Sequence, residues 1–223
     1  MITELARAKL NLALHVRARR PDGYHELETL FAFVDIGDRI EVAPADAAAL
    51  TISGPFGAAL HGEGDNLVTR AAARFAERFG GGQHRIALEK NLPVASGIGG
   101  GSADAAAALR ALAKLHGVAQ DDVQLFEIAD GLGSDVPACL YGRTAIGRGR
   151  GEQLNPAPSM AGTPVLLVNP GVAVSTAEVF RRWDGVDRGA LGPDPLAGRN
   201  DLEAPARTIA PVIDEVLALL GRV

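Results

Sequence analysis

Residues 93–104 read P-V-A-S-G-I-G-G-G-S-A-D, and an alanine-rich run, residues 104–116, follows them. Glycine occupies four of the five positions from Gly97 to Gly101. The alanine-rich run predicts a helix, and glycines directly before a helix let a ligand approach the backbone closely. Because the N–H groups of a first helical turn are unpaired and the helix dipole favours negative charge there, the stretch predicts a phosphate cradle. Ser102 adds a hydroxyl at or near the N-cap.

The two commonest phosphate loops do not fit this stretch. A P-loop needs Lys and Ser or Thr directly after its glycines, and a dinucleotide-binding fingerprint needs glycine at the position of Ser102. A flexible glycine linker is the alternative, although linkers rarely run directly into so strong a helix former. The sequence therefore predicts a third kind of phosphate loop.

The composition is that of a globular protein with a substantial core. The chain has 223 residues, of which 47% are hydrophobic, and a net charge of −5, which suits one large or two small domains. The acidic balance argues against a nucleic-acid partner. Cys139 is the single cysteine, so no intrachain disulfide is expected. Without an apolar leader or membrane span, we expect a cytoplasmic monomer or homodimer with no membrane partner.

Alternating strands and helices are predicted along the chain. Residues 8–16 alternate apolar and polar side chains, which predicts a half-buried strand with Lys9 and Asn11 on its polar face. Further strands are predicted at 27–36 and 39–43, joined by a hairpin turn at Gly37-Asp38, and at 50–53, 84–89, 144–154 (bent or bulged) and 165–168 (buried). Helices are predicted at 67–79, 121–129, 175–183 and 201–220, the last with a break before Pro211.

A second glycine-bearing loop, residues 131–137, contains one carboxylate, Asp135. Two interpretations of Asp135 are open: a plain helix N-cap or a functional acid. A lysine on a strand, a phosphate loop at a helix start and a carboxylate in a second loop form the set that phosphoryl transfer needs.

Five segments of the chain resemble the GHMP kinases. They are A-K-L-N-L at 8–12, D-G-Y-H at 22–25, P-x-x-x-G-x-G-G-G-S-A at 93–103, L-G-S-D-V-P at 132–137 and G-R-N-D-L-E at 198–203. The glycine loop marks the superfamily, and the D-G-Y-H segment resembles members that phosphorylate cytidine diphosphate-linked methylerythritol in the non-mevalonate isoprenoid pathway. The resemblance implies an α+β GHMP kinase fold. It consists of a ribosomal-protein-S5-domain-2-like α/β domain, residues 1–157, and a ferredoxin-like C-terminal domain, residues 158–223.

The resemblance also implies roles for individual residues. Asp135 would be the general base for the 2-hydroxyl of the substrate, and Lys9 would lie beside it. Tyr24 and His25 would hold the cytosine, with Phe180 as the opposite wall. ATP would lie over the cradle, in contact with Pro93, Val94, Ala95, Ser96, Gly97, Ile98, Gly99, Gly100, Gly101, Ser102 and Ala103.

Polar positions and the metal are implied less specifically. Asn11 and Asn66 resemble positions that line the substrate cleft. Mg²⁺ is expected with ATP; the Ser102 hydroxyl is one candidate contact and Asp104 the only acidic one.

Other functions stay open at this point. They are phosphorylation of galactose, homoserine or mevalonate by another GHMP kinase, nucleotide binding without turnover, and an RNA-binding module on the same fold. The family carries a third glycine segment near its C-terminus, which the resemblance would place after Val223. We therefore expect an incomplete second domain.

Overall fold

The computed structural model describes residues 1–60 and 66–221. In those residues no helix is long and apolar enough to cross a membrane. Backbone packing divides the chain into two compact units. Unit 1 comprises Met1–Leu10, Phe33–Val94 and Ile98–Arg143, and unit 2 comprises Asn11–Ala32, Ala95–Gly97 and Thr144–Val223. These units reflect packing rather than family domains, so the division into residues 1–157 and 158–223 stays a prediction.

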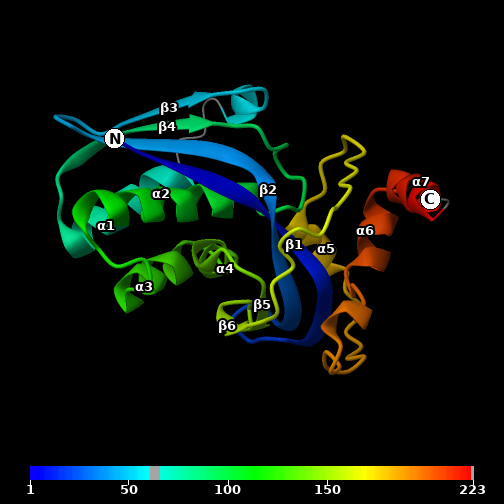
Figure 1. The fold of residues 1–223 in the computed structure, drawn as a ribbon. Coiled ribbons are helices and arrows are strands. Elements are labelled where there is room, and N and C mark those ends of the chain that lie inside the picture. The colour runs from blue at the N-terminus through cyan, green and yellow to red at the C-terminus, as the bar shows by residue number, and fades with distance from the viewer. Residues whose placement is uncertain (61–65, 222–223) are drawn as a thin grey trace. The chain divides into compact units, whose positions relative to one another are not determined.

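Unit 1 is a layer of strands covered by helices. Its strands come from the first residues of β1 (Ile2–Arg19), the second part of β2 (His25–Ala45), β3 (Ala49–Ser53) and β4 (Gln83–Glu89). β2 pairs antiparallel with β4, which pairs parallel with β3, and β1 pairs with β2. The helices are α1 (Leu67–Phe79), α2 (Gly100–His116), α3 (Val123–Leu132) and α4 (Val136–Tyr141), with a short 3-10 turn η1 (Gly57–Leu60). Figure 1 shows α1, α2, α3 and α4 gathered on one side of the strands.

The alanine-rich helix α2 lies at the centre of this unit. Its alanines and leucines from Ala103 to Ala113 are buried against α1 and α4. Alanine allows the neighbouring helices to approach closely, while Phe75 and Leu125 fill the remaining space. The helix begins at Gly100, four residues before the predicted start at Asp104.

The predicted hairpin at Gly37-Asp38 is wrong, because β2 continues through both residues. A Cβ at Gly37 would lie 2.8 Å from the carbonyl carbon of Ala6, so only glycine lets β1 pass this close. Asp38 is fully buried and accepts hydrogen bonds from later backbone. The two residues that resemble turn formers therefore serve tertiary packing.

Replacing Gly37 with alanine is expected to destabilise unit 1 by about 1–3 kcal/mol, because backbone has to move to admit the methyl group. Chemical denaturation measures the change. Gly57→Ala is the matched control: its Cβ would lie 3.4 Å from Ile52 Cγ2, and Gly57 has no positive φ. Equal stability of the two variants would contradict the prediction.

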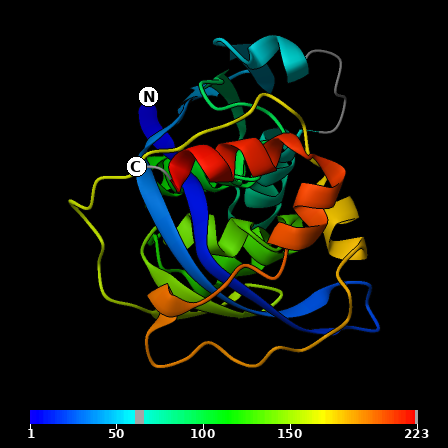
Figure 2. The ribbon, with the colours of Figure 1, turned by 90° about the vertical axis from the view of Figure 1, so that its right-hand side faces the viewer.

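Unit 2 contains the remaining parts of β1 and β2 and a set of short elements. These are β5 (Ala145–Gly149), β6 (Gln153–Pro156), α5 (Thr176–Arg181), the 3-10 turn η2 (Pro195–Ala197), α6 (Glu203–Ile209) and α7 (Val212–Leu220). β5 pairs antiparallel with β2 and with β6. The core consists of Leu14, Val16, Leu27, Val179, Trp183 and Leu202. Figure 2 shows the long segment before α6 running beside β1, where Leu14 bridges to Asn200.

Several predicted elements differ from the structure. Residues 144–154 form the β5–β6 hairpin rather than one bent strand. Residues 165–168 form no strand, and Leu166 is 70% exposed, because no neighbouring strand in the described chain pairs with this apolar run. The strand predicted at 8–16 extends over all of β1, and its polar face is covered as well, with His15 buried. The predicted helices at 67–79, 121–129, 175–183 and 201–220 are confirmed within a few residues.

Candidate active site

Lys9 and Asp135 form an ion pair inside unit 1. Lys9 Nζ lies 2.9 Å from Asp135 Oδ2. The lysine side chain is 5% exposed and the aspartate side chain 35%, so the cation is enclosed while the carboxylate faces outward. The Asp135 carboxylate is therefore accessible to a ligand, and the buried Lys9 ammonium group neutralises its charge from the protein interior.

Asp135 occupies the N-cap position of α4, yet its side chain makes no capping hydrogen bond. Its backbone carbonyl accepts from Cys139 N in the first turn. The plain N-cap interpretation is therefore wrong for the side chain, which is directed to Lys9 instead. Burial is the main reason that the pKa of the Cys139 thiol is raised to about 12, so this neighbouring sulfur is not a nucleophile.

The glycine loop lies directly against the same lysine. Gly99 has φ of 68°, and a Cβ there would be 3.0 Å from Lys9 Cε. The Lys9 backbone N–H also donates to the carbonyl of Ile98, at 3.0 Å. Since Cε and Nζ are adjacent atoms, the tip of one lysine separates the loop from the Asp135 carboxylate.

The first turn of α2 presents the backbone groups that an anion needs. The helix is capped by Gly99, and its first intrahelical bond runs from Ala103 N to Gly99 O at 2.8 Å. The amides of Gly100, Gly101 and Ser102 therefore have no acceptor within the helix. Ser102 lies in this first turn rather than at the N-cap.

Packing divides the predicted cradle. Pro93, Val94 and the residues from Ile98 onward belong to unit 1. Ala95–Gly97 belong to unit 2, where the Ala95 carbonyl accepts from Val174 N at 3.5 Å. Ala95 has φ of 55°, which is unusual for a residue with a Cβ.

Asp104 is not available as a magnesium ligand, which corrects that expectation. It is 2% exposed, and its Oδ2 lies 2.7 Å from Lys90 Nζ. Among the described residues no cluster of three or more His, Cys, Asp or Glu side chains could hold a metal ion. The Ser102 hydroxyl, in the first turn of α2, stays a candidate contact to Mg²⁺, with phosphate oxygens supplying charge.

Unit 2 gathers the aromatic residues. The His25 ring lies 5.0 Å from that of Phe180 and meets Trp183 edge-on at 5.7 Å. His25 Nε2 is buried and has no hydrogen-bond partner in the described chain. Burial, followed by the positive charge of Arg19, lowers the pKa of His25, which favours a neutral imidazole.

Tyr24 stands apart from that cluster. Its side chain is 46% exposed, and the guanidinium of Arg150 lies 4.9 Å above its ring. Because His25 and Phe180 are in contact, no third ring fits between them. In this arrangement a cytosine cannot lie between His25 and Phe180.

The two predicted asparagines have clear local partners. Asn11 Nδ2 donates to Thr29 Oγ1 at 2.7 Å, and that hydroxyl donates to the carbonyl of Ala13. Asn66 caps α1 by accepting from Val68 N. The preceding residue, Asp65, is also of a type that favours a helix N-cap, and it lies outside the described residues.

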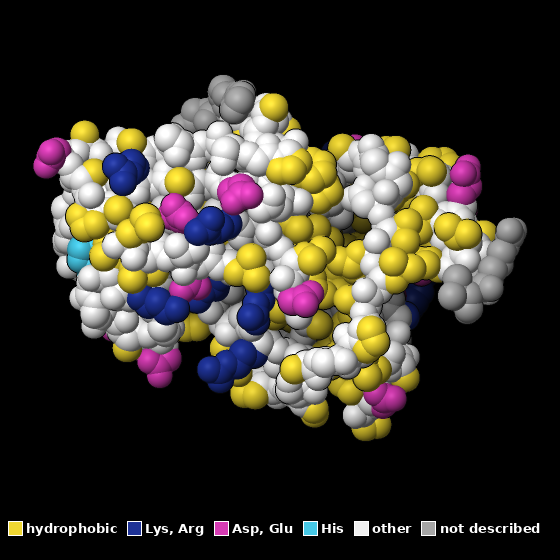
Figure 3. All heavy atoms as spheres, turned by 45° about the horizontal axis from the view of Figure 1, so that its top comes forward, with side chains coloured by type: hydrophobic (Ala, Val, Ile, Leu, Met, Phe, Trp, Pro, Cys, Tyr) yellow, Lys and Arg dark blue, Asp and Glu magenta, His cyan; other side chains and the backbone are white. Residues whose placement is uncertain are grey.

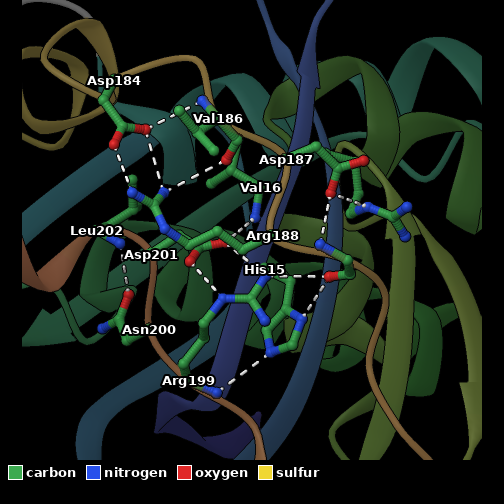
Figure 4. A network of polar contacts seen from close by, with 12 residues as sticks. His15, Val16, Asp184, Val186, Asp187, Arg188, Arg199, Asn200, Asp201 and Leu202 are labelled. Atoms are coloured by element: carbon green, nitrogen blue, oxygen red, sulfur yellow. Dashed lines mark hydrogen bonds and ion pairs between the residues drawn. The ribbon is translucent and has the colours of Figure 1, made fainter.

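The G-R-N-D-L-E segment fastens the loop before α6 to β1 (Figure 4). Asp201 accepts from Val16 N at 2.9 Å and from Arg199 Nε at 2.6 Å. His15 joins them, because its Nε2 accepts from Arg199 N and its Nδ1 contacts the carbonyl of Gly189. These side chains hold the loop before α6 against β1 within unit 2.

A pocket of about 580 Å³ lies in unit 2 beside this network. Its lining includes Trp183, Arg199 and Asp201 but none of the predicted site residues. Sequence reasoning missed two features: the buried Lys90–Asp38 pair and the role of Trp183 beside His25. No local signal marked the first, because Lys90 lies between Glu89 and Asn91 and Asp38 lies between Gly37 and Arg39.

Comparison with known proteins identifies the family. The GHMP kinase N-terminal domain matches residues 66–143. The 4-diphosphocytidyl-2-C-methyl-D-erythritol kinase of Rhizorhabdus wittichii is 54% identical, with 98% of this chain and 78% of the relative covered. That of Novosphingobium aromaticivorans is 51% identical, with 98% and 77% covered. A crystal structure of 4-(cytidine 5'-diphospho)-2C-methyl-D-erythritol kinase matches at 39% identity and a TM-score of 0.71, covering 96% of this chain and 81% of that one. The chain has the GHMP kinase fold and belongs to the 4-diphosphocytidyl-2-C-methyl-D-erythritol kinase family.

Proposed function

We propose that this protein transfers the γ-phosphoryl group of ATP to the 2-hydroxyl of 4-diphosphocytidyl-2-C-methyl-D-erythritol, a step of non-mevalonate isoprenoid synthesis. The observation that carries the chemistry lies in unit 1, where Gly99 at the start of α2 contacts Lys9 and Lys9 pairs with Asp135. The relatives named above, which are kinases of this alcohol by name, support the choice of substrate.

In this proposal Asp135 receives the proton of the attacking hydroxyl. The alcohol oxygen forms a bond to the γ-phosphorus, the bond from that phosphorus to the bridging oxygen breaks, and ADP leaves. Lys9 neutralises the carboxylate in the resting site and the negative charge near the reacting oxygen as the proton moves. Positioning and neutralisation of charge account for most of the rate enhancement, as is general for phosphoryl transfer.

The first turn of α2 would hold the phosphates. Amides of Gly100, Gly101 and Ser102 point out of the helix start, where the helix dipole favours anions. Mg²⁺, when bound with ATP, would neutralise phosphate charge, and the Ser102 hydroxyl is the residue of this turn that suits it.

Recognition of the cytosine is assigned to unit 2. Tyr24 and Phe180 would stack on the base, and His25 would meet its edge through the unpartnered Nε2. A neutral imidazole can donate to the ring nitrogen or carbonyl of cytosine or accept from its amino group, according to its tautomer. Asn11 would contribute a polar contact to the rest of the substrate.

Replacing Tyr24 with alanine is expected to raise the KM for the cytidyl substrate by roughly 5- to 100-fold, since base–aromatic stacking is worth about 1–3 kcal/mol. The KM for ATP should stay within twofold. Steady-state kinetics measures both constants, with Phe56→Ala as the control, because Phe56 is an exposed aromatic residue of unit 1. A Tyr24 variant with an unchanged KM for the cytidyl substrate would remove the stacking role.

The function itself is tested by incubating the protein with ATP and the cytidyl alcohol and following the phosphorylated product. Calorimetric ATP binding without product would favour a nucleotide-binding protein without turnover. Product from galactose, homoserine or mevalonate instead would favour another GHMP kinase. Figure 3 shows Lys and Arg side chains lying among Asp and Glu on one face, not the basic stripe that suits an RNA-binding module.

The cytoplasmic location, the monomeric or dimeric state and the lack of nucleic-acid and membrane partners stay predictions. The same holds for the incomplete C-terminal domain and the residues assigned to ATP.

A further inference from the structure

Three ionisable side chains meet in the interior of unit 1, beneath the start of α2. Lys90 Nζ lies 2.7 Å from Asp104 Oδ2 and also contacts Asp38 Oδ2. Lys90, Asp38 and Asp104 are 2%, 0% and 2% exposed. Asp104 Oδ1 is buried without a hydrogen-bond partner in the described part of the chain. We refer to these three residues as the triad.

The triad holds both ends of the glycine loop. On the entry side, Asp38 Oδ1 accepts from the backbone N–H groups of Asn91 at 2.5 Å and Leu92 at 2.7 Å. On the exit side, Asp104 belongs to α2, and a Cβ at Gly100 would lie 3.1 Å from Lys90 Nζ. Because Asp38 comes from β2 and Lys90 directly follows β4, the loop is fixed to the strands at its base.

Stability alone does not account for such a cluster. Burying charges carries a desolvation cost, and well-packed apolar residues often replace a buried ion pair or triad without loss of stability. With one lysine and two aspartates, the triad has no net charge when one carboxyl is protonated and a net charge of −1 when both are ionised. That charge lies directly behind the turn that would bind phosphates.

We propose that Asp38, Lys90 and Asp104 are positioning residues of the nucleotide loop, and that the charge of Asp104 sets how strongly the loop binds a triphosphate. The inference rests on the proposed function and extends it to groups that touch neither substrate. It explains why three ionisable groups are buried beside the first turn of α2, where the backbone amides must stay accessible to a ligand.

The test measures the dissociation constant of Mg-ATP by calorimetry at pH 8, for the wild type, Asp104→Asn and Glu4→Gln. The amide of the Asp104 variant has the shape of the carboxyl group and keeps the triad neutral. That variant should therefore bind roughly three- to fifteenfold more tightly than the wild type at pH 8, the effect of one charge across about 10 Å. Glu4→Gln removes a carboxylate that pairs with Arg110 and Lys114 on the same helix, and it should follow the wild type.

Gly100→Ala tests whether the triad positions the glycine loop, without removing a charge. Its methyl group would press on Lys90 Nζ, and we expect a higher dissociation constant for ATP and an unchanged KM for the alcohol. Wild-type affinity for Mg-ATP in Asp104→Asn, or in Gly100→Ala, would overturn the inference. A wild type that binds no ATP would overturn both the inference and the proposed function. A wild type that binds ATP but forms no product would overturn the function alone, and the affinities would still decide the inference.

Discussion

Asp135→Asn is expected to lower kcat by about 10³-fold while the dissociation constant for ATP changes little, because a general base contributes about 10²–10⁴ to the rate. The amide keeps the shape of the side chain but cannot accept the hydroxyl proton. Rapid-quench or steady-state measurement of product formation gives kcat, and calorimetry gives the affinity. The split between the two constants separates a chemical role from a binding role.

Asp121→Asn is the matched control, since it removes an exposed carboxylate of the same unit, just before α3. It should retain wild-type turnover. If the Asp135 variant also turned over at the wild-type rate, the proton would have to leave to another acceptor and the role of Lys9 would need revision.

Asp38→Ala is expected to destabilise the protein by about 3–5 kcal/mol, the largest stability effect we expect, because it leaves buried charge and backbone groups without partners. Lys90 would retain only Asp104, and the N–H groups of Asn91 and Leu92 would lose their acceptor. For a protein of this size the melting temperature should fall by roughly 10 °C.

Asp46→Ala provides the comparison, since Asp46 is an exposed aspartate in the turn after β2. Its melting temperature should match that of the wild type. Equal melting of the two variants would show that the buried contacts of Asp38 contribute nothing to folding.

Local sequence signals predicted the elements whose formation depends on local physics. The helix of α2 and its glycine start follow from propensity and unpaired end groups. The helices predicted at 67–79 and 175–183 likewise begin beside Asn66 and Ser175, residue types that favour an N-cap. The meeting of Lys9 with Asp135 did not follow from spacing, because the two residues are 126 positions apart in the chain. It was implied only by the resemblance to a family.

Elsewhere, long-range contacts determine a structure that differs from the one the local sequence predicts. Gly37-Asp38 has the composition of a turn, but close passage of β1 and the buried contacts of Asp38 keep β2 extended. The apolar run at 165–168 has the composition of a strand, but a strand needs a neighbour to satisfy its backbone. For the same reason the triad was not predicted: its members are brought together by two strands and a helix.

The burial of Cys139 has a practical consequence. Its sulfur is enclosed in the helical core of unit 1, beside the segment that carries Asp135, and the thiolate needed for alkylation hardly forms there. A maleimide or an iodoacetamide can therefore reach it only when that core opens. Because the sequence has no second thiol, the rate at which the native protein is labelled measures how often that core opens. A lower labelling rate in the presence of nucleotide would measure how far the bound ligand stabilises the closed core.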